Sequence, residues 1–144
     1  VFEQRFPPEI AGKVGLSGGN MTHAMQAVGC VGAISNGPSR DIDEIRPMGF
    51  QYLLSGITPG HGPTAVHAVN VPVSVAGMDV APGDIIHMDE NGAVKFPADK
   101  LEAVLTNVQK LRDEEAARMG ALRGTLSAAE VRAIFAGKGY AKKV

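Results

Sequence analysis

Residues 18–41 constrain the fold more than any other part of the chain, because they join a glycine-rich turn to a short apolar run. The stretch is GGNMTHAMQAVGCVGAISNGPSRD. Gly18 and Gly19 allow positive φ angles and close approach of the backbone to a ligand, and Asn20 is a residue type favoured at a helix N-cap. We predict a helix over residues 21–28, whose first N–H groups would lack intrahelical partners and form an anion site.

The second half of the stretch predicts an interior strand over residues 30–34, closed by a turn at residues 36–38. Cys30 falls in this strand, so we expect it to be a buried, small apolar residue rather than a nucleophile. Arg40 and Asp41 follow the turn. An anion site, a planar cation and a carboxylate would therefore meet at the mouth of the strand.

Two interpretations of Arg40 and Asp41 are open from spacing alone. In the first, the guanidinium binds a carboxylate or keto oxygen of a small oxo acid, and the Asp41 carboxylate holds a magnesium-like ion that keeps several waters. In the second, the two residues form a solvated ion pair that caps the next helix, since glycine-rich turns and Arg-Asp dipeptides are common.

Downstream, strand-like segments precede a helical C-terminal part. His61 lies between glycines in a Gly/Pro loop, where it is either a base or ligand or an exposed loop residue, and His67 is expected at a surface or interface. Our predictions in chain order are a helix at residues 42–45, strands at 50–54, 65–76 (one long strand or two joined ones), 84–88 and 93–96, a hairpin turn at 90–92, and helices with capping boxes that begin at Asp99 and Ser127.

The composition excludes several classes of protein. The chain has 144 residues, 14 Lys and Arg against 15 Asp and Glu, and a net charge of −1, which suits a single domain. It has no basic run typical of nucleic-acid binding, no apolar run long enough for a bilayer and no signal-peptide pattern. We therefore expect a cytoplasmic protein without a nucleic-acid or membrane partner.

The mixture of strands and helices predicts an α/β layered domain. We divide the chain into a partial N-terminal segment at residues 1–17, an α/β core with the ligand site at 18–97, and C-terminal helices at 98–144. A basic tail from Gly137 onward is expected to fray. The C-terminal helices are expected to pack on a neighbouring subunit through the apolar stripe of Leu101, Val104, Leu105, Val108 and Leu111.

Two motifs in this order, GCVGAISNGPSRD at residues 29–41 and VPVSVAGMDVAPGDIIHMDENGAVKFP at residues 71–97, resemble the RraA-like proteins. That family includes class II pyruvate aldolases acting on 4-hydroxy-4-methyl-2-oxoglutarate and 4-carboxy-4-hydroxy-2-oxoadipate. The resemblance covers roughly residues 18–115. It implies an α/β/β layered sandwich with a C-terminal helical extension, a homotrimer or hexamer, and active sites at subunit interfaces.

The resemblance also implies roles for individual residues. Arg40 matches the catalytic arginine on the keto or carboxylate oxygens, and Asp41 matches the carboxylate that holds Mg²⁺ or Mn²⁺. The implied reaction cleaves a 4-hydroxy-2-oxo acid to pyruvate, with the metal and Arg40 stabilising the enolate; oxaloacetate decarboxylation would use the same enolate. The loop whose backbone amides hold the substrate carboxylate corresponds to Gly18, Gly19, Asn20 and Met21.

Two positions depart from the family pattern. Many of the aldolases carry an acidic residue where this chain has Gly19, and an Asp where it has Asn36. Both changes remove negative charge near the metal. The family also has a longer region before the glycine loop than residues 1–17 supply, so we expect a fragment, a processed form or a short member.

Two functions therefore stay open. The first is a metal-dependent lyase, and the second is a non-catalytic regulator of the RraA type that binds a partner such as ribonuclease E. Asp41 favours the lyase, because the regulators generally lack that aspartate. A site shared between subunits could also receive an acid from a neighbour, for which Glu114 and Glu115 are the candidates.

Overall fold

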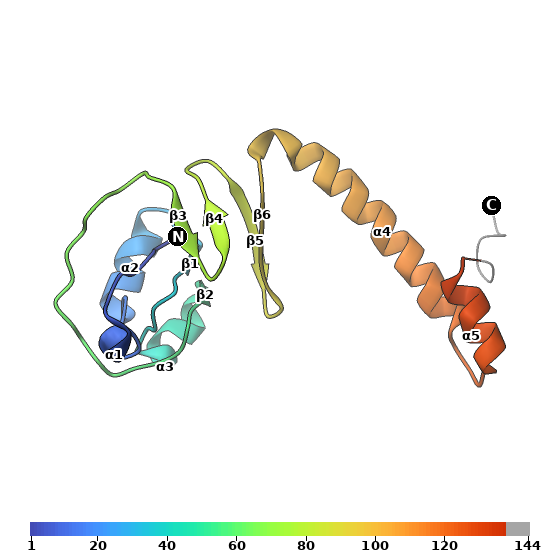
Figure 1. Cartoon of the computed structure of the whole chain (residues 1–144), viewed down its shortest axis with the longest axis horizontal. Helices are drawn as coiled ribbons and strands as arrows, with labels where there is room; N and C mark the ends of the chain where they lie inside the picture. The colour runs from blue at the N-terminus through green and yellow to red at the C-terminus, as the bar shows by residue number, and fades with distance from the viewer. Residues whose placement is uncertain (138–144) are drawn as a thin grey trace. The chain divides into compact units, whose positions relative to one another are not determined.

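The computed structural model describes residues 1–137, and the chain divides into two compact units between Ala98 and Asp99. The first unit holds three short helices and six strands, and the second holds the long helix α4 (Leu101–Ala121) and α5 (Ala128–Phe135). The α/β class with a C-terminal helical extension is thereby confirmed (Figure 1). The helices of the first unit are α1 (Pro8–Ala11), α2 (Gly19–Ala27) and α3 (Ile42–Ile45), and 3-10 turns lie at η1 (Arg46–Met48) and η2 (Ala98–Lys100).

The strands form three pairs. β1 (Gly32–Ile34) runs parallel to β2 (Gln51–Leu53). β3 (Val73–Val75) and β4 (Met78–Val80) form one antiparallel hairpin. β5 (Ile85–Asp89) and β6 (Gly92–Phe96) form a second. Parallel pairing of β1 and β2 brings their carboxyl ends to the same edge, which is where the Arg40–Asp41 segment leaves β1.

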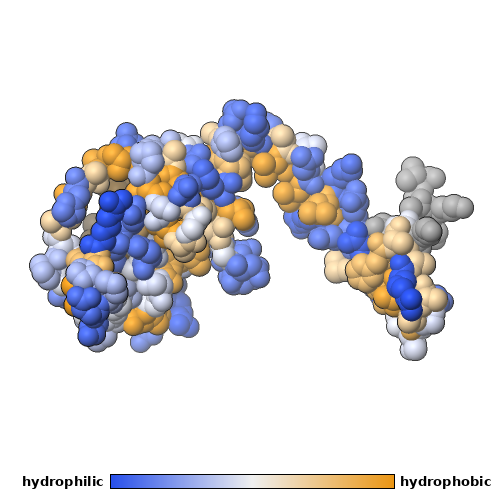
Figure 2. All heavy atoms as spheres, in the orientation of Figure 1, coloured by the Kyte–Doolittle hydropathy of each residue, from blue (hydrophilic) through white to orange (hydrophobic). Residues whose placement is uncertain are grey.

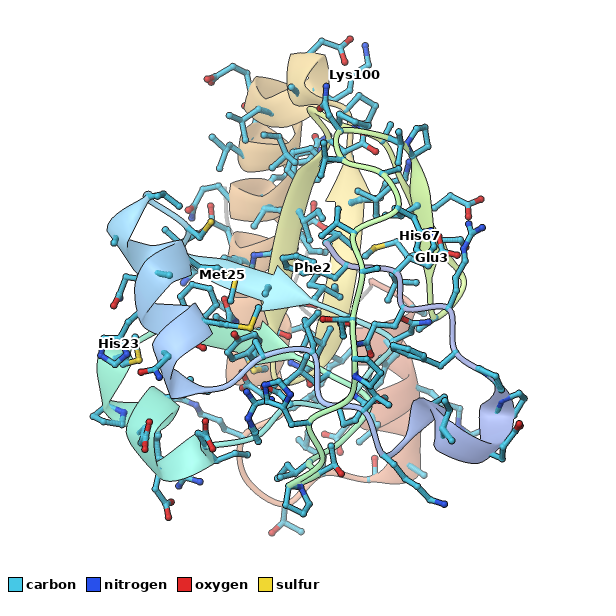
Figure 3. All side chains as sticks on the ribbon, turned by 90° about the vertical axis from the view of Figure 1, so that its left-hand side faces the viewer. Phe2, Glu3, His23, Met25, His67 and Lys100 are labelled. Carbon is cyan, nitrogen blue, oxygen red and sulfur yellow. The ribbon has the colours of Figure 1, made fainter. Side chains whose placement is uncertain are left out.

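The chain continues alongside β2 after β1 ends. The Ser35 N–H donates to the Leu53 carbonyl (3.0 Å), and the Ser39 N–H donates to the Gly56 carbonyl (3.1 Å). On the opposite side, Phe2 forms a parallel bridge with Ser35, and Figure 3 shows Phe2 beside the sheet. Residues 34–39 are therefore held between two neighbouring segments, which makes them a rigid base for the residues that follow.

The apolar core of the first unit is small. Its buried side chains come from the segment before α2, from β1, from α3, from the residue before β2 and from the β3–β4 hairpin. Their burial packs these elements together. They are Val14, Ala33, Ile34, Ile45, Phe50, Val75 and Val80.

Several local predictions are confirmed. The helix expected at residues 42–45 is α3. The predicted hairpin turn joins β5 to β6, and Gly92 has the positive φ of 135° that the turn needs. The capping box at Ser127 is present, with the Ser127 hydroxyl accepting from the Glu130 N–H.

Two strand predictions are wrong. The strand after α2 begins at Gly32 rather than at residue 30, and Cys30 is exposed, because Gly29 at φ 89° turns the chain before the sheet begins. Residues 65–72 form no strand and run in a long arc back to β3 (Figure 1); Val66 and Val69 are 83% and 77% exposed. Alternating β-branched residues favour a strand only where a neighbour supplies ladder hydrogen bonds.

Two helix-cap predictions are also wrong. Gly18, with extended φ and ψ, is the N-cap of α2, so Asn20 lies inside the first turn. The N-cap of α4 is Lys100, without a side-chain capping bond, since the Asp99 carboxylate accepts from the Lys100 ammonium at 2.7 Å instead.

The second unit, taken by itself, leaves much of α4 uncovered. Leu105, Val108 and Leu111 are 56%, 47% and 52% exposed, and orange patches mark α4 in Figure 2. Ile134 of α5 is buried. Packing of the stripe on a neighbouring subunit stays a prediction.

The expected basic tail falls almost wholly on residues 138–144, outside the described residues. Across residues 1–137, every helix is too short or too polar to cross a membrane.

The capping box predicts that the stability of the first turn of α5 depends on pH. Hydrogen bonds from the Ser127 hydroxyl and N–H lower the pKa of the Glu130 carboxyl below its ordinary 4.5. Such a carboxyl stabilises the fold at any pH above its pKa in the unfolded chain. The stabilisation is lost as the pH falls through its lower pKa in the folded chain. We expect Ser127→Ala to destabilise α5 near neutral pH by about 1 kcal/mol and to weaken this pH dependence. Urea unfolding followed by circular dichroism from pH 7 to 3 measures both, and Ser127→Thr should preserve wild-type behaviour.

Candidate functional site

Main-chain hydrogen bonds bring the glycine turn and the Arg40–Asp41 segment together. The Leu16 N–H donates to the Pro38 carbonyl at 2.7 Å, and the Arg40 N–H donates to the Ser17 carbonyl at 3.2 Å. Residues 16–17 therefore run beside residues 38–40, although more than 20 positions separate them in sequence. Arg40 and Asp41 consequently emerge next to Gly18.

The glycines of the turn make room for Arg40 and Asp41. A Cβ on Gly18 would overlap the Asp41 Oδ2 and would lie 2.9 Å from the Arg40 Nε. A Cβ on Gly15 would lie 3.4 Å from the Arg40 Nη1. The guanidinium is thus laid along two glycines and is largely buried, with 19% of the side chain exposed. Close approach, rather than positive φ, is what requires Gly18, because its φ of −142° is open to any residue.

Asp41 lies at a sharp corner, with φ 60° and ψ 41°, in the left-handed region. It occupies the N-cap position of α3 but makes no side-chain capping bond to that helix. Its Oδ2 accepts instead from the Gly19 N–H at 2.9 Å and lies 3.7 Å from the Arg40 Nε. The interpretation of a pair that caps the next helix is therefore wrong: the ion pair exists, and its carboxylate caps α2.

The predicted anion site is partly occupied by the chain itself. The first intrahelical bond of α2 runs from the Thr22 N–H to the Gly18 carbonyl (3.0 Å), so the N–H groups of Gly19, Asn20 and Met21 precede it. Asp41 takes the Gly19 N–H. An anionic ligand would meet the N–H groups of Asn20 and Met21, while Gly19 would join them only if Asp41 moved.

Glu44 adds a second carboxylate that the sequence did not predict. A Cβ on Gly19 would overlap the Glu44 Oε2, so the Glu44 carboxylate of α3 lies directly against the glycine turn. An acidic side chain at position 19 and the observed Glu44 would compete for the same space. The negative charge that Gly19 does not supply is therefore supplied from α3, and the only sequence signal for it was an acidic residue in the first turn of that helix.

A cluster of hydroxyl groups lies beneath the turn, and no sequence pattern predicted it. Ser17, Thr22 and Ser39 are 0%, 0% and 2% exposed. The Tyr52 hydroxyl of β2 lies 2.8 Å from the Ser17 Oγ and 2.8 Å from the Thr22 Oγ1. The Ser39 hydroxyl donates to the Ser17 carbonyl at 2.7 Å. Small polar residues so far apart in sequence carry no pattern that pairs them in advance.

Asn36 has a structural partner. Its Oδ1 accepts from the Gln4 N–H (2.7 Å), and its Nδ2 donates to the Gln4 carbonyl (2.8 Å). An aspartate at this position could accept but could not donate, so the amide is what ties the N-terminal segment to the end of β1. The departure from the family pattern at Asn36 thus fits a role in packing residues 1–6.

The donor set suits a hard divalent cation that keeps most of its water. Asp41, with 38% of its side chain exposed, and Glu44 place two carboxylates beside Gly19, and Mg²⁺ commonly uses one or two carboxylates. Among residues 1–137, no group of three or more His, Cys, Asp or Glu side chains is arranged to hold a metal ion. The two carboxylates could hold such a cation, whose remaining ligands would be water.

Of the other candidates, the histidines belong to the first unit and the two glutamates to the second. His61 is exposed in a loop that is tied to the site's edge, since the Gly15 N–H donates to the Gly60 carbonyl at 3.1 Å. His67 is exposed, as predicted. His23 projects from α2 (Figure 3), and its Nδ1 lies 2.9 Å from the Gly19 carbonyl oxygen. Glu114 and Glu115 are exposed on α4, in the second unit.

Comparison with known proteins identifies relatives of this chain. The family model for RraA-like proteins, described as Aldolase/RraA, matches residues 10–95, which is more than half of the chain. A 4-hydroxy-4-methyl-2-oxoglutarate aldolase of Thermus thermophilus is 30% identical over 86 residues, covering 59% of this chain and 52% of that protein. The chain spans between 15% and 52% of the length of the curated relatives that it matches.

Solved structures extend the comparison. A protein from Pseudomonas syringae pv. tomato is 25% identical with a TM-score of 0.71, over 83% of this chain and 60% of that one. The RNA-processing inhibitor RraA of Thermus thermophilus is 30% identical with a TM-score of 0.55, over 60% of this chain and 53% of that one. By name, the relatives and neighbours include both an aldolase and a regulator.

The close approach at Gly18 predicts a steric test of the site. We expect Gly18→Ala to push the Asp41 carboxylate and the Arg40 side chain away from the turn, at a cost of about 1–3 kcal/mol of unfolding free energy. Gly12→Ala is the matched control, because nothing lies within 4 Å of the added Cβ and its φ of −77° suits alanine. Urea unfolding of the two variants measures the difference, and equal stability would contradict the packing described here.

Proposed function

The chain belongs to the RraA-like family, and we propose that it is a divalent-metal-dependent lyase that releases pyruvate from a 4-hydroxy-2-oxo acid. One observation carries the proposal: Arg40 and Asp41, which are adjacent in sequence, both lie against Gly18 at the N-terminus of α2. A planar cation, a carboxylate and unpaired helix N–H groups thereby converge on one exposed edge. An aldolase by name among the relatives supports the proposal. Oxaloacetate decarboxylation would be a side activity of the same site.

Each residue of the site has a role in this proposal. The N–H groups of Asn20 and Met21, with Gly18 and Gly19 completing the loop, bind the carboxylate of the oxo acid. Arg40 is the catalytic residue, because its guanidinium donates to the 2-oxo oxygen, which gains negative charge as the C–C bond breaks. Its burial along Gly15 and Gly18 holds it in place before the substrate arrives.

A divalent cation, Mg²⁺ or Mn²⁺, would be held by Asp41 with its own waters and would polarise the 2-oxo group. Asp41 would then exchange its bond to the Gly19 N–H for the cation. That exchange frees the Gly19 N–H for the substrate carboxylate. Glu44, on the other side of Gly19, would orient a water in the first shell of the ion or add to the local negative charge that attracts it.

The regulator of the RraA type stays the second candidate. The RNA-processing inhibitor RraA of Thermus thermophilus shares the fold and 30% identity with this chain, and Gly19 lacks the carboxylate of many aldolases. Binding to a ribonuclease E-like partner without lyase activity is the expected result of this alternative. A metal requirement for pyruvate release distinguishes the two functions.

We also propose that the chain assembles as a homotrimer or hexamer. The apolar stripe of α4 is exposed in the isolated chain, with Leu105 at 56% and Leu111 at 52%. Burial of such a stripe against another copy would be favourable. In that assembly, Glu114 or Glu115 would be the acid donated to a neighbouring site.

The experiment that tests the function measures pyruvate release from a panel of 4-hydroxy-2-oxo acids and oxaloacetate, with and without Mg²⁺. We expect Mg²⁺-dependent release, and we expect Asp41→Asn to abolish it together with Mn²⁺ binding followed by electron paramagnetic resonance. The fold should survive, because asparagine tolerates the left-handed conformation of position 41 and its Oδ1 can still accept from Gly19. Asp43→Asn is the control, because Asp43 is an exposed carboxylate of α3, two residues after Asp41. Unchanged metal dependence in Asp41→Asn would exclude Asp41 as the ligand.

Arg40 should matter more for turnover than for folding. Lysine keeps the charge but lacks the planar fork, so we expect Arg40→Lys to lower kcat on the order of a hundredfold, which is typical of losing one oxyanion donor. Its ion pair with Asp41 is long, at 3.7 Å, and 38% of the Asp41 side chain is exposed, so the pair contributes little to stability. Steady-state kinetics and thermal unfolding of the same preparation measure both effects. An unstable variant that keeps wild-type kcat would show that Arg40 is structural.

A further inference from the structure

We propose that the Tyr52 hydroxyl is a positioning group that clamps the glycine turn to the Arg40–Asp41 segment. Tyr52 lies on β2 and touches neither Arg40 nor Asp41 through any of its hydrogen bonds. Its ring packs against Phe50 with centroids 4.9 Å apart. The role in catalysis rests on the proposed function, whereas the clamp itself can be tested without it.

The hydroxyl joins the two ends of the turn. Ser17 lies just before Gly18, and Thr22 lies in the first turn of α2 that follows it. Tyr52 bonds to both hydroxyls at 2.8 Å. Because Thr22 also donates to the Gly18 carbonyl at 2.8 Å, Tyr52 holds the residues on either side of the N–H groups that the site uses.

The same cluster reaches the other arm of the site through Ser17. The Ser17 carbonyl accepts both from the Ser39 hydroxyl (2.7 Å) and from the Arg40 N–H (3.2 Å). Ser17 therefore has its side chain bound to Tyr52 and its main chain bound to the residues that lead into Asp41. A displacement of Ser17 would move the turn and the Arg40 backbone relative to each other.

Counting the hydroxyl protons identifies the donor in each hydrogen bond of the cluster. Each hydroxyl has a single proton to donate. Thr22 gives its proton to the Gly18 carbonyl, so Tyr52 is the donor to Thr22, and Ser17 is the donor to Tyr52. Ser39 gives its proton to the Ser17 carbonyl, which leaves no proton for the Ser17–Ser39 hydroxyl contact and accounts for its length of 3.4 Å. The chain of donors runs from Ser17 through Tyr52 to Thr22 and ends on Gly18.

This count makes Tyr52→Phe a clean variant. The ring and its contact with Phe50 remain, Thr22 keeps its bond to the Gly18 carbonyl, and the freed Ser17 proton can turn to the Ser39 oxygen. No buried donor is stranded, so the variant is expected to fold. What it loses is the link between the two ends of the turn.

Hydrogen exchange of the Gly19 amide measures the clamp in the full chain. This N–H donates to the Asp41 Oδ2, so its protection reports whether the turn and Asp41 stay together. We expect it to exchange roughly tenfold or more faster in Tyr52→Phe and Thr22→Val. Thr22→Ser, which keeps the hydroxyl, should restore wild-type protection. The exchange rates of the amides in the β5–β6 hairpin should equal the wild-type rates in all three variants.

Thr106→Val is the matched control. Thr106 makes the same bond as Thr22, from its hydroxyl to the carbonyl four residues earlier (2.9 Å, to Glu102), but on the exposed face of α4. It should leave Gly19 exchange at the wild-type rate. Unchanged Gly19 exchange in Tyr52→Phe, or failure of Thr22→Ser to restore protection, would overturn the clamp.

Manganese titration of the same variants links the clamp to the proposed function. Because the Gly19 N–H competes with a cation for Asp41, we expect Tyr52→Phe, which loosens that bond, to lower the dissociation constant for Mn²⁺ by up to roughly tenfold. Wild-type Mn²⁺ affinity with fast Gly19 exchange would overturn the positioning role. Wild-type protein that neither binds Mn²⁺ nor releases pyruvate, but shows the exchange pattern, would defeat the proposed function and leave the clamp standing.

Discussion

The site depends on the carbonyl oxygen of Ser17. It accepts two hydrogen bonds from the segment that follows β1, one from the Ser39 hydroxyl and one from the Arg40 N–H. Two loops that contribute different chemistry, an N–H-rich helix start and an Arg-Asp pair, are thereby held in register. Because residues 34–39 are fixed in turn by the end of β2 and by Phe2, the register of the sheet determines where Asp41 emerges.

The parts of the fold that the sequence predicted are those settled by local chemistry. Ser127 and Glu130 form their capping box within four residues, and the turn before Gly92 needs only a residue that tolerates positive φ. The strand expected at residues 65–76 shows what a local sequence pattern cannot predict. Its alternation is real, but a strand also requires a partner edge, and only Val73–Val75 finds one, across the turn at Ala76 and Gly77. Pairing is a property of the whole chain, so a local pattern cannot decide it.

The same division holds in the site. A motif in the sequence was sufficient to predict that Arg40 and Asp41 lie near the glycine turn, because the Arg-Asp pair follows a turn that ends a strand. It was not sufficient to predict which helix the Asp41 carboxylate would cap, since that depends on the left-handed corner at Asp41 and on the register with Ser17. Tyr52 and Thr22 were missed for a similar reason: 30 residues separate them, and neither belongs to a recognisable motif.

Gly19 shows how one position can serve packing and chemistry together. Its missing side chain leaves the space that the Glu44 carboxylate fills, and its N–H is held by Asp41. Two carboxylates are thus gathered around a helix N-terminus, where the dipole favours negative charge, with Arg40 as the adjacent cation. A cation that binds these carboxylates competes with the helix N–H for Asp41, and a ligand anion competes with Asp41 for the helix N–H. Cation and anion would therefore favour each other's binding, because each removes the partner that masks the other's site, and this reciprocity follows from thermodynamic linkage.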